Sequence, residues 1–177
     1  MVKTKYFLLV DDDNFFIDET NIEKLVDVLE STDAHFVGGD HIVASIYCGY
    51  FGKFTFNRTA EDGKVTLIHE NGIYYEKIRD FQHCYRVDII KNFYVARKDD
   101  VLKFGGWRNE LIVMEHEDFF INVLQYDAKI IFCTDIKIGH LQTNDPVRQY
   151  RFSIENNYSK IWQEMNNVDV YDYRATN

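Results

Sequence analysis

A short apolar run that stops at three consecutive aspartates constrains the fold of this chain more than any other feature. Residues 5–10 read Lys-Tyr-Phe-Leu-Leu-Val, and Asp11, Asp12 and Asp13 follow immediately. Apolar runs of this length without alternation are typical of strands that are buried on both faces of a parallel sheet. We therefore predict a central, parallel-type strand over 5–10, with functional residues at its C-terminal end.

The segment after the aspartates has the periodicity of a helix. Its apolar residues recur at the spacing i, i+3, i+4 and i+7, at Ile22, Leu25, Val26 and Leu29. Thr20 and Glu23 have the spacing of a capping box, so we predict a helix that is capped by Thr20 and runs to about Glu30. A second buried strand is predicted over 34–38. Strand, helix and strand in this order indicate an α/β fold.

The rest of the chain is predicted to continue this pattern within one domain, residues 1–177. Tyr and Phe alternate with polar residues around several glycines, which predicts a β-meander or hairpin over 41–77. The further predicted elements are a strand over 92–96, a helix from about 99 to just before Gly105, a helix from about 115, strands over 129–133 and 136–140, a helix over 147–165 and a polar tail.

Charge and composition exclude several classes of function. The chain has 20 basic and 29 acidic residues, a formal charge of −9, which argues against nucleic acid as a partner. Its three cysteines form no CxxC pair, so a zinc site is not expected, and their odd number excludes a fully paired disulfide set. No apolar run is long enough to span a bilayer. The sequons at Asn57 and Asn157 weakly favour a secretory setting.

The aspartate run itself can bind a cation. Because successive residues of a strand face opposite sides, Asp11 and Asp13 are expected to point together and Asp12 away from them. Two carboxylates on one side can hold a hard divalent ion, which in turn can bridge a diphosphate. The alternative is a solvated acidic turn. A calcium-binding EF-hand loop is excluded, because Phe16 stands where that loop needs glycine.

A second acidic group, Glu115-His116-Glu117-Asp118, stands where a helix is predicted to begin. Acids in a first helical turn are favoured by the helix dipole, which is a purely structural explanation. The functional alternative is a general base that takes the proton from an attacking hydroxyl. Gly106 and Trp107 come before this group and could form a sugar-binding wall. His140 ends the last predicted strand, as a structural histidine or as a further metal ligand.

Three blocks of this sequence, in this order, resemble the β-1,4-N-acetylgalactosaminyltransferase family of GT-A glycosyltransferases, which makes ganglioside-type glycans. The first block runs from Phe-Leu-Leu-Val-Asp-Asp-Asp-Asn-Phe-Phe at 7–16 to Phe-Val-Gly-Gly at 36–39. The second runs from Asn-Phe-Tyr-Val-Ala-Arg at 92–97 to Glu-Asp-Phe-Phe at 117–120, and the third is 135–140. The resemblance covers roughly residues 5–140. It implies a GT-A, Rossmann-like mixed sheet flanked by helices, without the first nucleotide-binding strands.

The resemblance also implies roles for particular residues. Asp11 and Asp13, with Asp12 close by, would form a DxD motif that binds Mn²⁺ (or Mg²⁺) and the diphosphate of a UDP-sugar. His140 would be a further metal ligand. Asp118, or alternatively Glu117, would be the catalytic base of an inverting transfer. Residues that could contact the donor sugar are Asp88, Asn92, Gly106 and Trp107.

The donor implied by the family is UDP-GalNAc, UDP-Gal or UDP-GlcNAc, and the acceptor a glycan or glycolipid hydroxyl. The implied location is the Golgi lumen. There are two alternatives to an active transferase. The chain could be a catalytically incomplete sugar- and metal-binding fragment, or a binding module without activity. A phosphatase or nuclease is disfavoured, because neither a nucleophilic aspartate with a partnering lysine nor an arrangement of two acidic clusters around two metals is visible.

Overall fold

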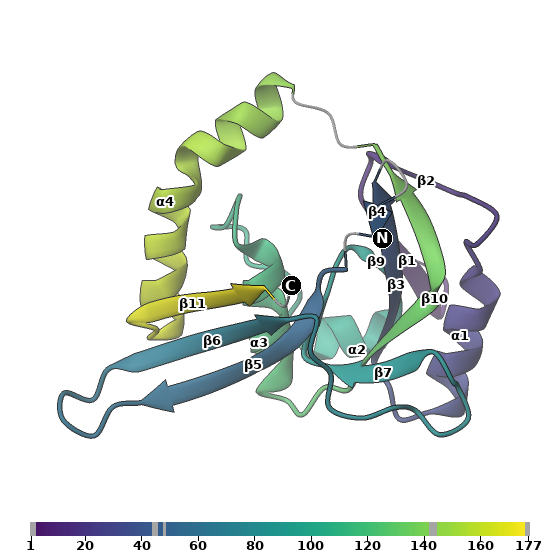
Figure 1. The fold of residues 1–177 in the computed structure, drawn as a ribbon, viewed down its shortest axis with the longest axis horizontal. Coiled ribbons are helices and arrows are strands. Elements are labelled where there is room, and N and C mark those ends of the chain that lie inside the picture. The colour runs from purple at the N-terminus through teal and green to yellow at the C-terminus, as the bar shows by residue number, and fades with distance from the viewer. Residues whose placement is uncertain (1–2, 44–45, 48, 142–144, 176–177) are drawn as a thin grey trace.

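Two β-sheets organise the chain in the computed structural model, which describes residues 3–43, 46–47, 49–141 and 145–175 (Figure 1). Sheet A contains, in spatial order, β1 (Tyr6–Val10), β9 (Phe93–Arg97), β3 (Phe36–Val43), β10 (Ile130–His140) and β2 (Asn14–Phe15), with β4 (Ile46–Tyr47) paired to β3 and β7 (Cys84–Val87) paired to β10. Sheet B contains β11 (Val170–Ala175), β6 (Val65–Asn71), β5 (Phe51–Arg58) and β8 (Ile89–Ile90). The helices are α1 (Ile22–Ser31), α2 (Lys98–Lys103), α3 (Glu115–Leu124) and α4 (Pro146–Asn166). The predicted mixture of helices and strands is confirmed.

The strand that precedes the aspartates forms, but its predicted position in the sheet is wrong. β1 lies at the end of sheet A and pairs antiparallel with β9, so that Val10 faces Phe93. β9 pairs antiparallel with β3 as well, so β1 and β3 run in the same direction with β9 between them. An apolar run reports that both faces of a strand are covered. Such a run does not indicate whether the strand is parallel or antiparallel to its neighbours, or whether it lies at the centre or the edge of the sheet.

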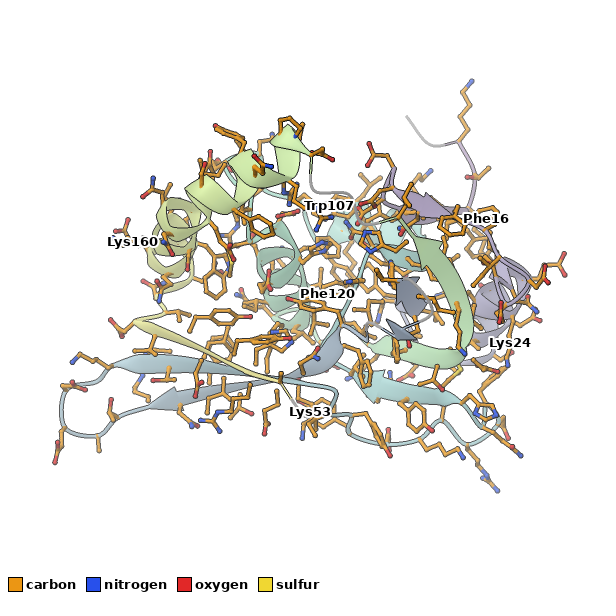
Figure 2. The ribbon with its side chains drawn as sticks, turned by 45° about the horizontal axis from the view of Figure 1, so that its top comes forward. Phe16, Lys24, Lys53, Trp107, Phe120 and Lys160 are labelled. Atoms are coloured by element: carbon orange, nitrogen blue, oxygen red, sulfur yellow. A yellow bond between two sulfur atoms is a disulfide. The ribbon has the colours of Figure 1, made fainter. Side chains whose placement is uncertain are left out.

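Both faces of sheet A are covered, and the side chains alternate between them. Phe36, Tyr94 and Phe132 belong to the apolar cluster that α3 completes with residues such as Phe120, which Figure 2 labels inside the molecule. Their neighbours in the chain, such as Val37, Val95 and Cys133, belong to the cluster formed with Leu25, Val28 and Leu29 of α1. This two-residue alternation explains why the strand sequences are apolar throughout.

Helix α1 begins one residue later than predicted, because Asn21 caps it. The Asn21 side chain accepts a hydrogen bond from the Lys24 backbone N–H at 2.9 Å. The Thr20 hydroxyl instead donates to the Lys137 carbonyl at 2.7 Å, which ties this loop to β10. The predicted capping box of Thr20 and Glu23 is therefore wrong, since a tertiary contact takes the threonine hydroxyl.

Two further predictions need correction at the C-terminal side of the chain. The strands predicted over 129–133 and 136–140 form one strand, β10, whose pairing with β3 shifts register between Cys133 and Lys137. The predicted polar tail contains β11, which extends sheet B by pairing parallel with β6 (Figure 1). Tyr171 and Tyr173 alternate with polar residues there, and this alternation is the strand signal that the sequence offered.

A disulfide between Cys84 and Cys133 joins β7 to β10. The two cysteines face each other in the pairing of these strands and are 49 residues apart in the chain. Closing a loop of this length stabilises the folded state by roughly 4 kcal/mol, chiefly through restriction of the unfolded chain. No helix within the described residues is long and apolar enough to cross a membrane.

Candidate active site

The three aspartates line a cleft of about 610 Å³. It lies where β1 and β10 end and where α3 and α4 begin, as the element bounds show. From the strand ends it is lined by Asp11, Asp12, Asp13 and His140. From α3 it is lined by Glu115 and His116, and from α4 by Arg148 and Arg151 among others. The cleft therefore brings residues of the first and third family-like blocks, 7–39 and 135–140, next to α4, which follows both blocks in the sequence.

Asp13 and His140 meet because β2 pairs with β10. The pairing sets Asn14 opposite His140, and the Leu141 backbone N–H donates to the Asp13 carbonyl at 2.8 Å. The His140 Nε2 then lies 2.9 Å from the Asp13 Oδ2. The Nδ1 of His140 is buried and has no hydrogen-bond partner among the described residues. The two residues that were predicted as metal ligands are thus in direct contact with each other.

Asp11 is positioned by the neighbouring strand. Because Val10 faces Phe93 across the sheet, Asn92 lies beside Asp11, and its side-chain amide donates to the Asp11 Oδ1 at 2.8 Å. Asn92 was predicted to contact the donor sugar, and in the structure it orients a carboxylate of the cleft. Among the described residues, no three His, Cys, Asp or Glu side chains are gathered as a ready-made metal site.

A second histidine stands behind His140. His41 is 2% exposed, and its ring lies edge-on to that of His140 with the centroids 5.9 Å apart. Burial lowers the pKa of His41 to about 3, so its imidazole is neutral at physiological pH. His41 therefore supports the His140 ring as an uncharged aromatic neighbour.

The first turn of α3 divides into residues that face the cleft and residues that are buried. Glu115 and His116 line the cleft, and the Glu115 carboxylate accepts a hydrogen bond from Arg151 at 2.8 Å. Glu117 and Asp118 are 8% and 2% exposed and are not among the residues that line it. The helical rotation of about 100° per residue places Glu117 on the face of α3 opposite to Glu115.

The buried acids have protein partners of their own. The Glu117 carboxylate accepts a hydrogen bond from the Tyr50 hydroxyl, and the Tyr171 hydroxyl of β11 lies 3.5 Å from the same oxygen. The Asp118 carboxylate accepts a hydrogen bond from the Asn166 side chain at 2.9 Å, and Arg108 lies 3.4 Å away. Burial raises the pKa of Asp118, and the nearby Asn166 and Arg108 oppose that shift.

The remaining predicted site residues lie outside the lining of this cleft. Gly106 has a φ of 70°, a left-handed conformation that suits glycine, and it leads into Trp107. The Trp107 ring stacks on Phe119 with a centroid distance of 4.5 Å and is 38% exposed (Figure 2). Asp88 is buried, where its Oδ2 accepts hydrogen bonds from the Phe54 backbone N–H at 2.8 Å and the Tyr75 hydroxyl at 2.6 Å.

Arg148 and Arg151 are site residues that the sequence analysis missed. Both come from the predicted helix after Pro146, and they stand three residues apart, so they share one helical face. The spacing was visible in the sequence. Their nearness to the aspartates was not, because α4 reaches the cleft only through the tertiary fold.

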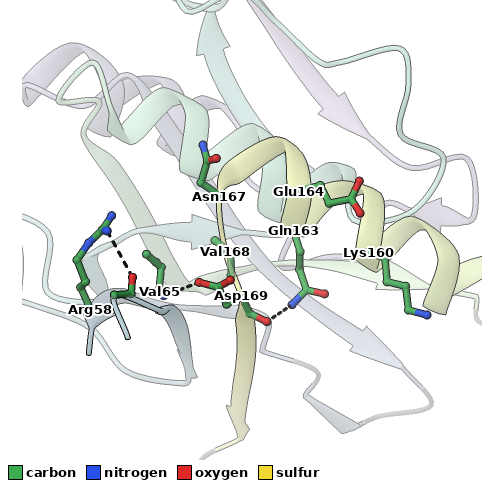
Figure 3. A pocket seen from close by; sticks show the side chains of 9 residues that line it. Arg58, Val65, Lys160, Gln163, Glu164, Asn167, Val168 and Asp169 are labelled. Atoms are coloured by element: carbon green, nitrogen blue, oxygen red, sulfur yellow. Dashed lines mark hydrogen bonds between the residues drawn. The ribbon is translucent and has the colours of Figure 1, made fainter. Parts of the chain in front are cut away.

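A larger cleft, of about 810 Å³, lies between the β5–β6 hairpin and the C-terminal end of α4 (Figure 3). It contains none of the predicted site residues. The Asp169 carboxylate accepts from the Val65 N–H at 2.7 Å, which ties the hairpin to the chain after α4. Gln163 of α4 donates to the Asp169 carbonyl at 3.2 Å. The smaller, acidic cleft, which contains several of the predicted site residues, is therefore the candidate site.

Known proteins related to this chain carry glycosyltransferase names. No protein-family model matches the chain. The β-1,4 N-acetylgalactosaminyltransferase 1 of Rattus norvegicus is 32% identical over 139 residues, which are 78% of this chain and 26% of that protein. The protein of the same name from Homo sapiens is 30% identical over 139 residues. The β-1,4 N-acetylgalactosaminyltransferase 2 of Mus musculus is 29% identical over 169 residues, 94% of this chain and 31% of that protein.

The chain thus spans between about a quarter and a third of the length of these curated relatives. The matched stretch nevertheless covers most of the chain itself, 78% or 94% depending on the relative. The resemblance predicted from the three sequence blocks is confirmed: this chain is related by sequence, over most of its length, to the β-1,4-N-acetylgalactosaminyltransferase family.

Proposed function

We propose that this protein is an inverting, metal-dependent glycosyltransferase that moves a hexose or N-acetylhexosamine from a UDP-sugar to a hydroxyl of a glycan or glycolipid. The observation that carries the proposal is the acidic cleft, which Asp11 lines together with the contacting pair Asp13 and His140. The names of the relatives favour N-acetylgalactosamine among the three candidate sugars.

Asp13 and His140 are the proposed protein ligands of Mn²⁺ or Mg²⁺, with Asp11 as a further ligand. Their donor set suits such an ion, because carboxylate oxygen and imidazole nitrogen both bind Mn²⁺. Two or three protein ligands leave positions for water and for phosphate oxygens, which is the usual arrangement where a cation holds a nucleotide. When bound, the cation would neutralise charge on the departing UDP.

The proposed catalytic base is Asp118, with Glu117 as the alternative. Burial raises the pKa of Asp118, which strengthens its carboxylate as a proton acceptor once ionised, and Arg108 favours that ionised form. The Glu117 carboxylate is already bonded to the Tyr50 hydroxyl. In the proposed reaction the base takes the proton of the acceptor hydroxyl while that oxygen attacks the anomeric carbon.

The rival function is a sugar- and metal-binding module without turnover. Calorimetric titration with UDP, in the presence and absence of Mn²⁺, tests the cleft first. We expect micromolar, Mn²⁺-dependent binding, weakened about 100-fold or more in Asp13→Ala, the loss that follows when a direct metal ligand is removed. No binding at millimolar UDP would contradict a working transferase.

A transfer assay with radiolabelled donor then distinguishes the enzyme from the module and tests the base. We expect Asp118→Asn to lower kcat by roughly 10²–10⁴-fold, the range typical of general-base catalysis, with UDP affinity unchanged. Glu117→Gln and Glu115→Gln are the matched variants in the same helical turn. If Asp118→Asn keeps full turnover and Glu115→Gln loses it, the base is the acid that lines the cleft.

We propose the Golgi lumen as the compartment. A Cys84–Cys133 disulfide persists in oxidising compartments and is rare in the cytosol. Both sequon asparagines, Asn57 and Asn157, are exposed, as glycosylation requires. Mass spectrometry of the protein purified from eukaryotic cells, before and after enzymatic deglycosylation, tests this: a protein found with neither glycan nor disulfide would contradict the assignment.

A further inference from the structure

The acidic cleft has a basic wall that the proposed metal site does not explain. Its strand side carries Asp11, Asp12 and Asp13, and its opposite side is the start of α4, which carries Arg148 and Arg151. A site that bound only a cation would not gain from two guanidinium groups beside its ligands. A site that bound a cation together with an anion would be stabilised by these two guanidinium groups.

Arg148 approaches the atom that is proposed to bind the cation. Its Nη2 lies 3.6 Å from the Asp13 Oδ2, the oxygen that also contacts the Nε2 of His140. This distance is within ion-pair range and longer than a hydrogen bond. A divalent cation on this oxygen would repel the guanidinium, so the cation and Arg148 compete for Asp13.

Arg151 is likewise paired with an acidic side chain of the cleft, that of Glu115 in α3. Its Nη2 donates to the Glu115 Oε1 at 2.8 Å, and its side chain is 46% exposed. A half-exposed ion pair of this kind contributes little to stability and is readily exchanged for a stronger anion. Phosphate is such an anion, because the planar guanidinium can bind two of its oxygens at once.

We propose that Arg148 and Arg151 bind the diphosphate of the nucleotide-sugar donor, and that Asp13 and Glu115 hold them in its absence. This inference rests on the proposed function and adds the anion-binding half of the same site. The backbone favours the same ligand, since the N-terminal end of α4, capped by Asp145, presents the positive end of its dipole to the cleft. Cation and nucleotide then bind cooperatively, because each relieves a contact that opposes the other.

Separate titrations with MnCl₂ alone and with UDP at saturating Mn²⁺ test the proposal. For Arg148→Ala we expect Mn²⁺ alone to bind severalfold more tightly and UDP to bind about tenfold more weakly, the loss expected for a charge-assisted hydrogen bond. Arg151→Ala should weaken UDP binding similarly but leave Mn²⁺ binding unchanged, because Glu115 is its partner. Arg148→Lys should recover part of the UDP affinity.

The control is Lys160→Ala, which removes a cation from the same helix at the larger cleft and should change neither titration. Thermal unfolding identifies a variant that fails to fold, and a misfolded variant would lose both affinities rather than gain one. UDP affinities within twofold of wild type in both arginine variants would overturn the inference while leaving the proposed function intact. A wild-type protein that binds neither Mn²⁺ nor UDP would overturn both.

Discussion

The two acidic groups of this chain look alike in the sequence and differ completely in their surroundings. Asp11–Asp13 follow a strand and line an open cleft, where Asp13 is in contact with a histidine and an arginine. Glu117 and Asp118 begin a helix and are buried, each with a polar partner from β11, α4 or the loop before α3. The first group lines an open cleft, whereas the carboxylates of the second group have partners within the protein.

This comparison predicts which carboxylates contribute to the stability of the fold and which are available for binding. Substitution of a buried carboxylate leaves its hydrogen-bond partners unpaired, so the change is expected to destabilise the fold. A carboxylate that lines a cleft can be replaced with little effect on folding, because water takes its place. Four substitutions test this contrast.

The largest effect is expected for Glu117→Ala. The change leaves the hydroxyls of Tyr50 and Tyr171 without the carboxylate that they share, so the free energy of unfolding should fall by about 2 kcal/mol or more. Urea unfolding measures it. Glu117→Gln is the matched control, since its side-chain oxygen can still accept, and it should lose less. Equal stability of wild type and Glu117→Ala would show that this acid is not structural.

Asp118→Asn should change the pH dependence of stability. Because burial raises the pKa of Asp118 above 3.8, the folded protein binds this proton more tightly than the unfolded chain does. Wild type therefore loses stability as pH rises from the unfolded pKa through the folded pKa, and the asparagine variant does not. The stability of the variant relative to wild type should rise across this acidic range and then level off.

Unfolding of both proteins by urea at several pH values checks this sign. Asp62→Asn is a control with the opposite expectation, because Lys64 lowers the pKa of the exposed Asp62 carboxyl. That variant should lose stability relative to wild type as pH rises. Parallel curves for wild type and Asp118→Asn would mean that Asp118 titrates alike in both states.

A smaller effect is expected for Asp13→Asn. Its side chain is 33% exposed and its ion pairs are partly solvated, so the free energy of unfolding should change by less than about 0.5 kcal/mol. Relief of repulsion among three consecutive aspartates offsets part of any loss. Thermal and urea unfolding measure the change. A loss well above 1 kcal/mol would place Asp13 with the structural acids.

The smallest effect is expected for Glu115→Gln, two positions before Glu117 in the same helix. Its partner Arg151 is 46% exposed, and ion pairs of this kind contribute roughly 0.3 kcal/mol. Comparison of this variant with Glu117→Gln under the same urea conditions isolates burial as the cause, since both substitutions replace a glutamate in one helical turn. Similar losses of unfolding free energy in the two variants would contradict the distinction between Glu115 as a cleft residue and Glu117 as a buried structural one.

Much of the secondary structure could be predicted because local patterns determine it. The apolar spacing of Leu25 and Leu29 indicated α1, and the glycine-flanked Tyr and Phe residues indicated the hairpin of β5 and β6. The predictions failed where a distant contact competes with a local one. Thr20 bonds to Lys137 instead of capping α1, and β9 inserts between β1 and β3.

The candidate site divides in the same way. Asp11, Asp13 and His140 could be predicted from residue type and position at strand ends, and the structure brings them to one cleft. The sequence could not distinguish Asp88 from these cleft residues. Its carboxylate is buried and accepts hydrogen bonds from the Phe54 backbone and the Tyr75 hydroxyl. The type of a residue indicates which groups its side chain can bind, but the surroundings of the side chain in the folded protein determine which of them it contacts.

The α/β pattern, the position of the aspartates after a strand and the relationship to a family of sugar transferases could all be inferred from the amino-acid sequence alone. That Glu115 lines the cleft and Glu117 does not, and that Arg148 lies beside Asp13, follow from the packing of distant elements. The physical reason is the range of the interactions. Periodicity and capping act over a few residues, whereas the environment of a charge depends on every element that folds against it.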